Sequence, residues 1–395
     1  MLDRAIFRNS EHSFLIGIGC EDEFHMGSSL NWNELDSFIR KHPGRTLFTI
    51  INYQLGLDIL NVPRKANDLP LLRIWLPKST YLQQENHLTL LEGEDSEIHY
   101  EAAKNVFQSD EAAPSSLQWK AKIHRDTYIE RVNKLKEHIQ LGDVYEINFC
   151  QSFEVNGVEL KSMQPIFHSL WKNNPTPFAA LVETNDWMLA SASPERFIRK
   201  KGNRLISQPI KGTAPRGKTE PEDQQLIREL ETNPKERSEN VMIVDLVRND
   251  LSQIATKGSV SVDELCAVYS FPTVHQLIST VSCDLKENTS FSDILKASFP
   301  MGSMTGAPKK AAVELAEQYE GFSREFYSGS LGVIYPNGDF DLNVLIRTMV
   351  YNPQLKQLSC GVGGAITILS DAEAEYEECK AKVGKILALF GTCQW

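Results

Sequence analysis

The sequence predicts an α+β fold built on antiparallel sheet. Short apolar runs bounded by turn residues recur along the chain, and the strongest hairpin signal is Pro336-Asn337-Gly338-Asp339, between extended segments at 328–335 and 340–351. Helical patterns interrupt the extended segments but do not alternate with them in βαβ order. Hairpins interrupted by helices are typical of the α+β class.

Composition limits the classes of function. The chain has 395 residues, a net charge of −11, seven scattered cysteines and no apolar run long enough to span a membrane. The negative charge argues against nucleic acid as a main partner, because phosphate binding needs a basic surface. The cysteine pattern fits a reducing compartment. We therefore expect a soluble cytoplasmic protein with no nucleic-acid or membrane partner.

The first third of the chain is predicted to form strands and contains no catalytic constellation. Its main apolar runs, each bounded by Gly, Pro, Asn or Asp, cover residues 14–18, 46–51 and 71–76. The small, acidic stretch 106–118, which carries Pro and Ser, is the best linker candidate. We therefore predict an N-terminal portion over residues 1–110 and a second domain over residues 118–395.

The second domain is predicted to mix strands and helices. A helix with an apolar stripe begins at a Thr127/Glu130 capping box and ends at Gly142, and Val144–Phe153 follows as a strand. A hairpin then turns at Lys201-Gly202-Asn203. Further helices are predicted near 221–230, 234–249, 308–321 and, from a Ser370/Glu373 capping box, 370–390, and a further strand is predicted over 357–368.

Lys211 follows the return strand of this hairpin and stands next to a glycine. Pro209 excludes helix there, and Gly212 lets another group approach the backbone closely. Most lysines are solvated at the surface. A nucleophilic or basic lysine would need a pKa of ~7–8 in place of its usual ~10.4. The position alone leaves both roles open.

Two predicted helices each carry a pair of glutamates three residues apart. Residues at that spacing share a helix face, so each pair presents two carboxylates in one direction. If the two faces meet across a pocket, hard oxygen ligands converge, and such ligands select Mg²⁺. A solvated helix face is the simpler explanation for either pair alone. The pairs are Glu236 with Glu239, and Glu375 with Glu378.

Three other polar residues are candidates for a site. Arg347 ends a predicted strand, and burying it without a carboxylate partner would be costly. Tyr327 opens the same hairpin and would add a hydroxyl. His275 is of a type that is more often a satisfied structural residue than a catalyst.

Taken together, these segments resemble the chorismate-utilising enzymes, which include anthranilate, aminodeoxychorismate, isochorismate and salicylate synthases. Eight blocks arrive in the family's order over about residues 120–395, and the first third matches only weakly. The blocks are SPERF (193–197), PIKGTAPRG (209–217), ENVMIVDLVRNDL (239–251), GSMTGAPK (302–309), SGSLG (328–332), IRT (346–348), GVGGAI (361–366) and EAEYEECKAK (373–382).

The resemblance implies a fold and a reaction. The fold would be a sandwich of two antiparallel sheets flanked by helices, which residues 1–110 complete around a chorismate-binding domain at 118–395. A lysine before Gly-Thr, here Lys211, is similar to component I of the aminodeoxychorismate synthases, whereas anthranilate and isochorismate synthases typically have alanine there. Chorismate would be aminated at carbon four through a covalent lysine intermediate, in para-aminobenzoate and folate synthesis. The ammonia would come from a separate glutamine amidotransferase subunit.

One position departs from that pattern. The isochorismate and salicylate enzymes place a water-activating lysine in the strand that matches Val144–Phe153, and aminodeoxychorismate synthases usually have glutamine there. This chain has Glu146. The departure concerns the local hydrogen bonding of the site, not the reaction.

The resemblance also implies roles for individual residues. Lys211 would attack ring carbon two while Glu195 protonates the departing 4-hydroxyl, and Glu195 would have to be kept protonated by burial. His275 would complete the catalytic set beside the ring. Mg²⁺ would be held by Glu239 and Glu378, with Glu236 and Glu375 close by. The substrate-binding set would be Thr305, Tyr327, Arg347, Gly361, Gly363, Gly364 and Lys382.

Two alternatives remain open from the sequence. Anthranilate synthase component I would release anthranilate and pyruvate from the same pocket. A non-catalytic subunit would bind chorismate or a partner on the same scaffold. The second alternative has no need of the complete polar set Glu195, Lys211, Glu239, Arg347, Glu378 and Lys382.

Overall fold

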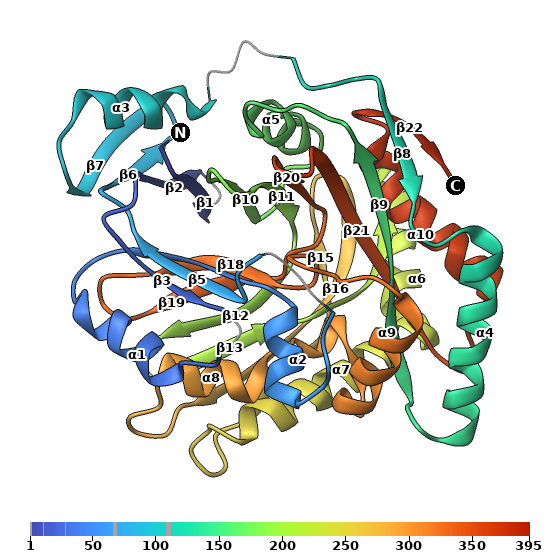
Figure 1. Ribbon diagram of the computed structural model, residues 1–395. Coiled ribbons are helices and arrows are strands. Elements are labelled where there is room, and N and C mark those ends of the chain that lie inside the picture. Colours follow the sequence, from blue (N-terminus) through green and yellow to red (C-terminus); the bar gives the residue numbers. More distant parts are fainter. Residues whose placement is uncertain (1, 11, 28, 66–68, 108–111) are drawn as a thin grey trace.

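The computed structural model describes residues 2–10, 12–27, 29–65, 69–107 and 112–395. Two large β-sheets pack against each other, and helices cover their outer faces (Figure 1). This architecture confirms the predicted α+β class and the sandwich of two sheets flanked by helices. None of the helices in the described ranges is both long and apolar enough to cross a membrane.

The larger sheet, sheet A, has twelve described strands. They are β1 (Arg4–Ser10), β2 (Ser13–Ile18), β6 (Ser79–Gln84), β7 (His87–Gly93), β8 (Leu117–Ala121), β9 (Glu146–Asn156), β10 (Phe178–Glu183), β11 (Met188–Ser193), β17 (Gly306–Ala307), β20 (Thr348–Asn352), β21 (Gln357–Ile366) and β22 (Gly391–Gln394). The order is β22-β8-β9-β21-β20-β11-β10-β1-β2-β6-β7, and β17 pairs with β9 outside that path. The pair β22–β8 is parallel, and the other described pairs are antiparallel.

The second sheet, sheet B, has ten described strands. They are β3 (Asp22–Met26), β4 (Leu47–Ile51), β5 (Leu72–Leu76), β12 (Arg196–Lys201), β13 (Arg204–Gln208), β14 (Ile210–Pro215), β15 (Ser261–Ser270), β16 (Val274–Asp284), β18 (Ser330–Ile334) and β19 (Phe340–Asn343). The order is β14-β16-β13-β12-β19-β18-β4-β5-β3. The long strand β16 pairs with β15 on one side and with β13 and β14 in succession on the other.

Apolar side chains hold the layers together. Between the sheets, Phe48, Trp75 and Leu331 of sheet B pack in one cluster with Phe7 and Leu189 of sheet A. A second cluster joins the outer face of sheet B to helices α1, α7 and α8, and a third joins sheet A to α4, α9 and α10. The helices are α1 (Trp32–Lys41), α2 (Gln54–Leu60), α3 (Glu97–Lys104), α4 (Arg125–Leu141), α5 (Gln164–Asn173), α6 (Glu220–Thr232), α7 (Pro234–Ser252), α8 (Phe291–Ser298), α9 (Lys309–Glu320) and α10 (Ala372–Leu387), with short 3-10 turns η1 (Asn105–Phe107) and η2 (Gly302–Met304).

Strands from the first third of the chain enter both sheets. β1, β2, β6 and β7 lie in sheet A, and β3, β4 and β5 lie in sheet B. The described part of the predicted linker 106–118 ends in η1 on one side and begins β8 on the other. Its residues 108–111 lie outside the described residues. The division into 1–110 and 118–395 therefore stays a prediction.

Both predicted capping boxes are wrong. Helix α4 begins at Arg125, with His124 in the N-cap position, so Thr127 lies inside the first turn; the predicted end at Gly142 is confirmed by its left-handed φ of 86°. Helix α10 is capped one residue later than expected. Asp371 accepts hydrogen bonds from the amides of the first turn, because Ser370 instead accepts one from the amide of Thr367.

The chain passes between the two sheets at two points. β11 lies in sheet A and β12 in sheet B, so the chain crosses at Pro194-Glu195. β19 lies in sheet B and β20 in sheet A, so it crosses back over residues 344–347. The single extended segment predicted over 340–351 is therefore wrong, since it is two strands of different sheets.

These two crossings lie side by side. The amide of Val344 donates to the carbonyl of Glu195 at 3.0 Å, and the amide of Ala192 donates to the carbonyl of Arg347 at 3.0 Å. The hydroxyl of Ser193 donates to the carbonyl of Val344 at 2.6 Å. Two segments about 150 residues apart in the chain are thus joined where each leaves one sheet for the other.

Candidate active site

Glu195 leaves the first crossing with its carboxylate buried. The residue is 4% exposed, and its Oε1 is buried without a hydrogen-bond partner among the described atoms. Burial raises the pKa of Glu195 to about 7, against the opposing effects of a hydrogen bond from Ser303 and the charges of Lys211 and Arg347. The expectation that burial keeps this carboxyl protonated is met in direction. Below about pH 7, Glu195 therefore holds a proton that it can donate.

Arg347 ends the second crossing in a strained conformation. Its φ is 51°, in the left-handed region that costs a non-glycine residue about 1–3 kcal/mol. Burial lowers the pKa of its guanidinium, and Glu195 partly opposes that effect. No carboxylate of the described residues lies within the 4.0 Å ion-pair distance of it. A largely buried cation without an ion-pair partner is suited to bind an anionic ligand.

Lys211 lies among three buried carboxylates. Its Nζ is 3.1 Å from Oε1 of Glu146, and the two side chains are 11% and 1% exposed. Burial lowers the pKa of Lys211, but the charges of Glu146, Glu239 and Glu195 outweigh it, and the net shift is upward. A nucleophilic lysine needs the opposite shift, a pKa lowered to ~7–8. In the protein alone, Lys211 is an ammonium at neutral pH.

A bulge in β14 positions Lys211. The pairing of β14 with β16 shifts register between Ile210 and Thr213. Gly212 lies in this bulge with a φ of 90°, and a Cβ there would come within 3.0 Å of Oε2 of Glu236. A side chain at position 212 would therefore be strained by this φ and would crowd the side chains of Glu236 and Leu277. The predicted close approach to this glycine is confirmed, and the approaching group is a carboxylate.

The two helices that carry the paired glutamates face each other. Nζ of Lys235, on α7, lies 3.4 Å from Oε1 of Glu375 on α10 and 3.9 Å from Oε1 of Glu239 on its own helix. On α10, Nζ of Lys382 lies 2.6 Å from Oε1 of Glu378. The structure thus brings the four predicted carboxylates to one region, together with two ammonium groups.

These carboxylates are incompletely neutralised. Burial raises the pKa of Glu239 to about 7 and also raises that of Glu236. Oε1 of Glu239 is buried without a hydrogen-bond partner among the described residues. At Glu378 burial also favours the neutral form, but Lys382 and Lys235 outweigh it and lower the pKa. An under-compensated buried carboxylate oxygen beside other carboxylates fits a hard cation such as Mg²⁺.

Glycines of β21 open space on both sides of the strand. A Cβ on Gly361 would come within 2.3 Å of the ring of Tyr327, so this glycine lets the buried tyrosine pack against the strand. A Cβ on Gly363 would meet Oδ1 of Asn148 at 2.6 Å. Gly364 faces α10, within 3.8 Å of Nζ of Lys382. Because side chains alternate along a strand, Gly361 and Gly363 open the face that Tyr327 covers, and Gly364 opens the opposite face, toward Lys382 of α10.

The hydroxyl of Thr305 donates hydrogen bonds within its own loop, residues 301–307. Thr305 is 2% exposed and donates to the carbonyls of Met301 and Gly302 at 3.1 and 3.3 Å. The loop is tied to β9, because the amide of Asn148 donates to the carbonyl of Thr305 at 2.7 Å. The buried Arg324 also donates to this loop, at the carbonyl of Met304. Thr305 is thus held in place by its own loop and by β9.

The structure does not bring His275 to this cluster. Its ring is fully buried, with Nε2 2.9 Å from Oδ1 of Asp223 and Nδ1 2.8 Å from Oγ of Ser270. Both ring nitrogens are engaged outside the Lys211 site, so a structural role explains His275. Its strand neighbour Gln276 points to the opposite face of β16 and has a buried Oε1 without a described partner.

Sequence reasoning missed two groups of the site. Lys235 precedes Glu239 by four residues, and that i,i+4 spacing was a readable signal for an ion pair on one helix face. Ser303, which hydrogen-bonds Glu195, had no comparable signal, because its contact joins segments more than one hundred residues apart.

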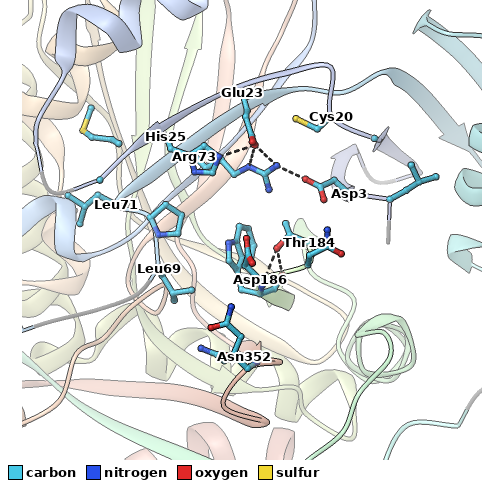
Figure 2. A pocket seen from close by; sticks show the side chains of 18 of the residues that line it. Asp3, Cys20, Glu23, His25, Leu69, Leu71, Arg73, Thr184, Asp186 and Asn352 are labelled. Atoms are coloured by element: carbon cyan, nitrogen blue, oxygen red, sulfur yellow. Dashed lines mark hydrogen bonds and ion pairs between the residues drawn. The ribbon is translucent and has the colours of Figure 1, made fainter.

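A separate cavity of about 880 Å³ lies away from these residues. It is bordered by β3, β5 and the β10–β11 turn, and Figure 2 shows the guanidinium of Arg73 between the carboxylates of Asp3 and Glu23. Ligand atoms of Asp3, Cys20 and Glu23 lie within 4.8 Å of one another. Because Arg73 already neutralises both carboxylates, this cluster does not need a metal. The buried titratable groups predicted from the sequence lie at the Lys211 site instead.

Comparison with known proteins places the chain. The sequence profile of the chorismate binding enzymes matches residues 4–388. The chain belongs to this family. The family match includes the first third of the chain, which resembled the family only weakly by its motifs.

Several similar proteins carry one name. The chain is 41% identical over 271 residues to an aminodeoxychorismate synthase of Streptomyces griseus and 38% identical over 283 residues to aminodeoxychorismate synthase component 1 of Escherichia coli K12. These matches cover 68% and 71% of this chain, but only 37% and 61% of the two relatives. The chain thus spans less than two thirds of their length.

Solved structures agree on the fold. Anthranilate synthase component I from Streptococcus pneumoniae TIGR4 superposes with a TM-score of 0.81 at 22% identity, covering 95% of this chain and 92% of that one. The menaquinone-specific isochorismate synthase MenF from Escherichia coli superposes with a TM-score of 0.78 at 16% identity, covering 98% and 88%. The two-sheet sandwich is therefore the architecture of this chorismate-binding enzyme.

Proposed function

We propose that the chain is component I of an aminodeoxychorismate synthase, which converts chorismate and ammonia to 4-amino-4-deoxychorismate. The observation that carries the proposal is a buried lysine, Lys211, beside a buried carboxyl, Glu195, whose pKa of about 7 keeps it able to donate a proton. A nucleophile next to a proton donor is what a displacement of a ring hydroxyl requires. The names of the relatives support the same reaction.

Two cationic positions suit the two carboxylates of chorismate. Arg347, without an ion-pair partner among the described residues, would bind the enolpyruvyl carboxylate, and the hydroxyl of Tyr327 would lie beside it. The ring carboxylate would lie toward α10, near Lys382 and the strand glycines. Fixed cations at both ends of the substrate would hold ring carbons two and four in register with Lys211 and Glu195.

The reaction then proceeds in two displacements. Neutral Nζ of Lys211 forms a bond to ring carbon two, the ring double bonds shift, and the bond from carbon four to its hydroxyl breaks as Glu195 donates its proton to give water. Ammonia next forms a bond to carbon four, the double bonds shift back, and the bond from carbon two to Nζ breaks. Lysine is regenerated and the amine replaces the hydroxyl.

The carboxylates of α7 and α10 fit Mg²⁺, which would neutralise the ring carboxylate of the substrate when bound. Glu239 and Glu378 would hold it, and Glu236 and Glu375 would support it directly or through water. Glu239 supplies the under-compensated oxygen for this role. The ammonium of Lys235 lies between the same helices and balances their charge in the protein alone.

We expect Glu239→Gln and Glu378→Gln each to raise the Mg²⁺ concentration for half-maximal turnover by about tenfold or more, since even outer-shell changes alter metal affinity by ~10–100-fold. The measurement is a metal titration of the rate at saturating chorismate. Glu373→Gln is the matched control, because Glu373 lies on α10 but pairs with Arg125 at the surface. If both variants need no more Mg²⁺ than the wild type, these glutamates are not metal ligands.

The partner and the compartment belong to the same proposal. Ammonia would be supplied by a glutamine amidotransferase subunit, because the names of several relatives designate them as component 1 of the synthase. The seven cysteines are all unpaired, and five of them are buried, as in proteins of a reducing cytoplasm. The product would feed para-aminobenzoate and folate synthesis.

The test is incubation of the protein with chorismate, Mg²⁺ and ammonium salt, with and without an amidotransferase partner and glutamine. Products are identified by mass and by fluorescence. We expect aminodeoxychorismate without release of pyruvate. Fluorescent anthranilate with pyruvate would show the anthranilate synthase reaction, and isochorismate would show water as the nucleophile. No turnover with the partner present would favour a binding subunit.

A further inference from the structure

We propose that Glu146 accepts the proton of Lys211 before the lysine attacks chorismate, and returns it when the lysine is expelled. The inference rests on the proposed function, because it concerns the same nucleophile. It assigns a catalytic proton acceptor to position 146, where a glutamine could not take up a proton in this way.

The contact between the two side chains is direct and dry. Oε1 of Glu146 lies 3.1 Å from Nζ of Lys211, within the distance for proton transfer along a hydrogen bond. The glutamate side chain is 1% exposed, and its other oxygen, Oε2, is buried without a hydrogen-bond partner among the described atoms. Among the described residues, no other group donates a hydrogen bond to this carboxylate. A proton from Lys211 would therefore reduce the free-energy cost of burying it.

The attacking lysine needs such an acceptor. An amine is a nucleophile only when neutral, and the surrounding carboxylates hold the pKa of Lys211 above its ordinary value despite burial. Without a local acceptor, the proton would have to leave to solvent at high pH. In a buried pair, transfer of the proton turns an ammonium and a carboxylate into two neutral groups, which burial favours.

The other carboxylates near Lys211 have different tasks. Glu195 must already carry the proton for the departing hydroxyl, so it cannot accept another. Glu239 and Glu236 face α10 and are the proposed metal ligands, and no ion pair within 4.0 Å joins either to Lys211 in the described structure. The charged groups that act on the Lys211–Glu146 pair or on its neighbours are Glu195, Arg347, Glu236, Glu239, Lys235 and Glu378.

The protons balance over one catalytic cycle. Lys211 ammonium gives one proton to Glu146, and the neutral amine forms its bond to carbon two while Glu195 gives a proton to the leaving hydroxyl. After the amine adds to carbon two, its nitrogen carries a positive charge, which it loses when ammonia bonds to carbon four and the bond from carbon two to Nζ breaks. Nζ leaves as a neutral amine and recovers the proton from Glu146. The proton that Glu195 lost is recovered from the ammonium formed on carbon four.

The test is the pH dependence of adduct formation in Glu146→Gln, measured by rapid mixing with chorismate and Mg²⁺ without ammonia, with the Lys211 adduct followed by intact-protein mass spectrometry. Loss of the Glu195 proton affects both proteins equally, so the ratio of variant to wild-type rates isolates Glu146. We expect this ratio to rise by about tenfold per pH unit between about pH 6 and 8, because Lys211 must then lose its proton to solvent.

A ratio that is flat, or that falls with pH, overturns the proposal. A falling ratio would mean that Glu146 only holds Lys211 charged and that its loss unmasks the amine. The matched control is Glu183→Gln, the same change at a buried glutamate of sheet A that pairs with Arg4 outside the site. It is expected to lower the unfolding temperature and leave the ratio flat.

A second variant tests the proposal in case Glu146→Gln does not fold. Glu146→Asp keeps a proton acceptor on a shorter side chain, so we expect a lower rate with a flat ratio over the same pH range. A ratio that rises with pH in this variant overturns the proposal. If wild-type protein forms no adduct and no aminodeoxychorismate, the proposed function fails instead, which separates the two results.

Discussion

Replacing Lys211 with alanine is expected to abolish amination of chorismate at carbon four. The substitution removes the only group that the mechanism places on ring carbon two, and loss of a covalent nucleophile costs about 10³-fold or more in rate. It also removes the cation whose charge lowers the pKa values of Glu239 and Glu195, so those two pKa values should rise. The measurement is aminodeoxychorismate formation by mass at saturating chorismate and ammonium.

Lys200→Ala is the control for this experiment. Lys200 lies on β12 of the same sheet, with Nζ 3.7 Å from Asp339 at the far end of the hairpin, and its loss should leave amination unchanged. Circular dichroism and thermal unfolding of both variants exclude a folding defect. Unchanged aminodeoxychorismate formation by Lys211→Ala would show that Lys211 is not the nucleophile.

Replacing Glu195 with glutamine is expected to lower the rate of amination by about 10²–10⁴-fold, the usual contribution of a positioned proton donor. The buried carboxyl has a pKa raised to about 7, so the protonated form dominates below that pH and is lost as pH rises through it. The wild-type rate should therefore fall on the alkaline side of about pH 7. The residual rate of the variant should lack that fall.

The pH profile distinguishes this role from a structural one. A variant that only disturbed packing would lose rate at every pH and keep the alkaline limb. Glu183→Gln again serves as the control, since it removes a buried glutamate that lies outside the site. An alkaline limb that persists at the same pH in Glu195→Gln would assign it to another group.

Local patterns in the sequence predicted part of this site. The i,i+3 spacing of the paired glutamates fixed one face on each helix, and the structure brings the two faces together. The glycine beside Lys211 predicted a close approach, which Glu236 makes. Such features depend on a few neighbouring residues, and their geometry is the same in any fold.

The rest depends on contacts between distant segments. The extended run 340–351 has no local sign of a change of sheet, so the crossing that carries Arg347 was not foreseen. The sequence left the protonation state of Lys211 open, because that state depends on Glu146, 65 residues away, and on α7. The contacts of His275 with Asp223 and Ser270 also join separate segments, and the sequence carries no local sign of them.

The paired crossings have a consequence for how the enzyme distinguishes its substrate. Glu195 and Arg347 start from backbone segments that hydrogen-bond to each other and are continuous with both sheets. A shift of either backbone segment would disturb the hydrogen bonds between the crossings and the pairing of the strands that continue from them. The backbone therefore sets the spacing between the points from which the proposed proton donor and the proposed anion-binding cation extend. We therefore expect molecules of a different length to bind poorly, and we expect changes of reaction to arise at side chains outside the two crossings, such as Glu146 and Lys211.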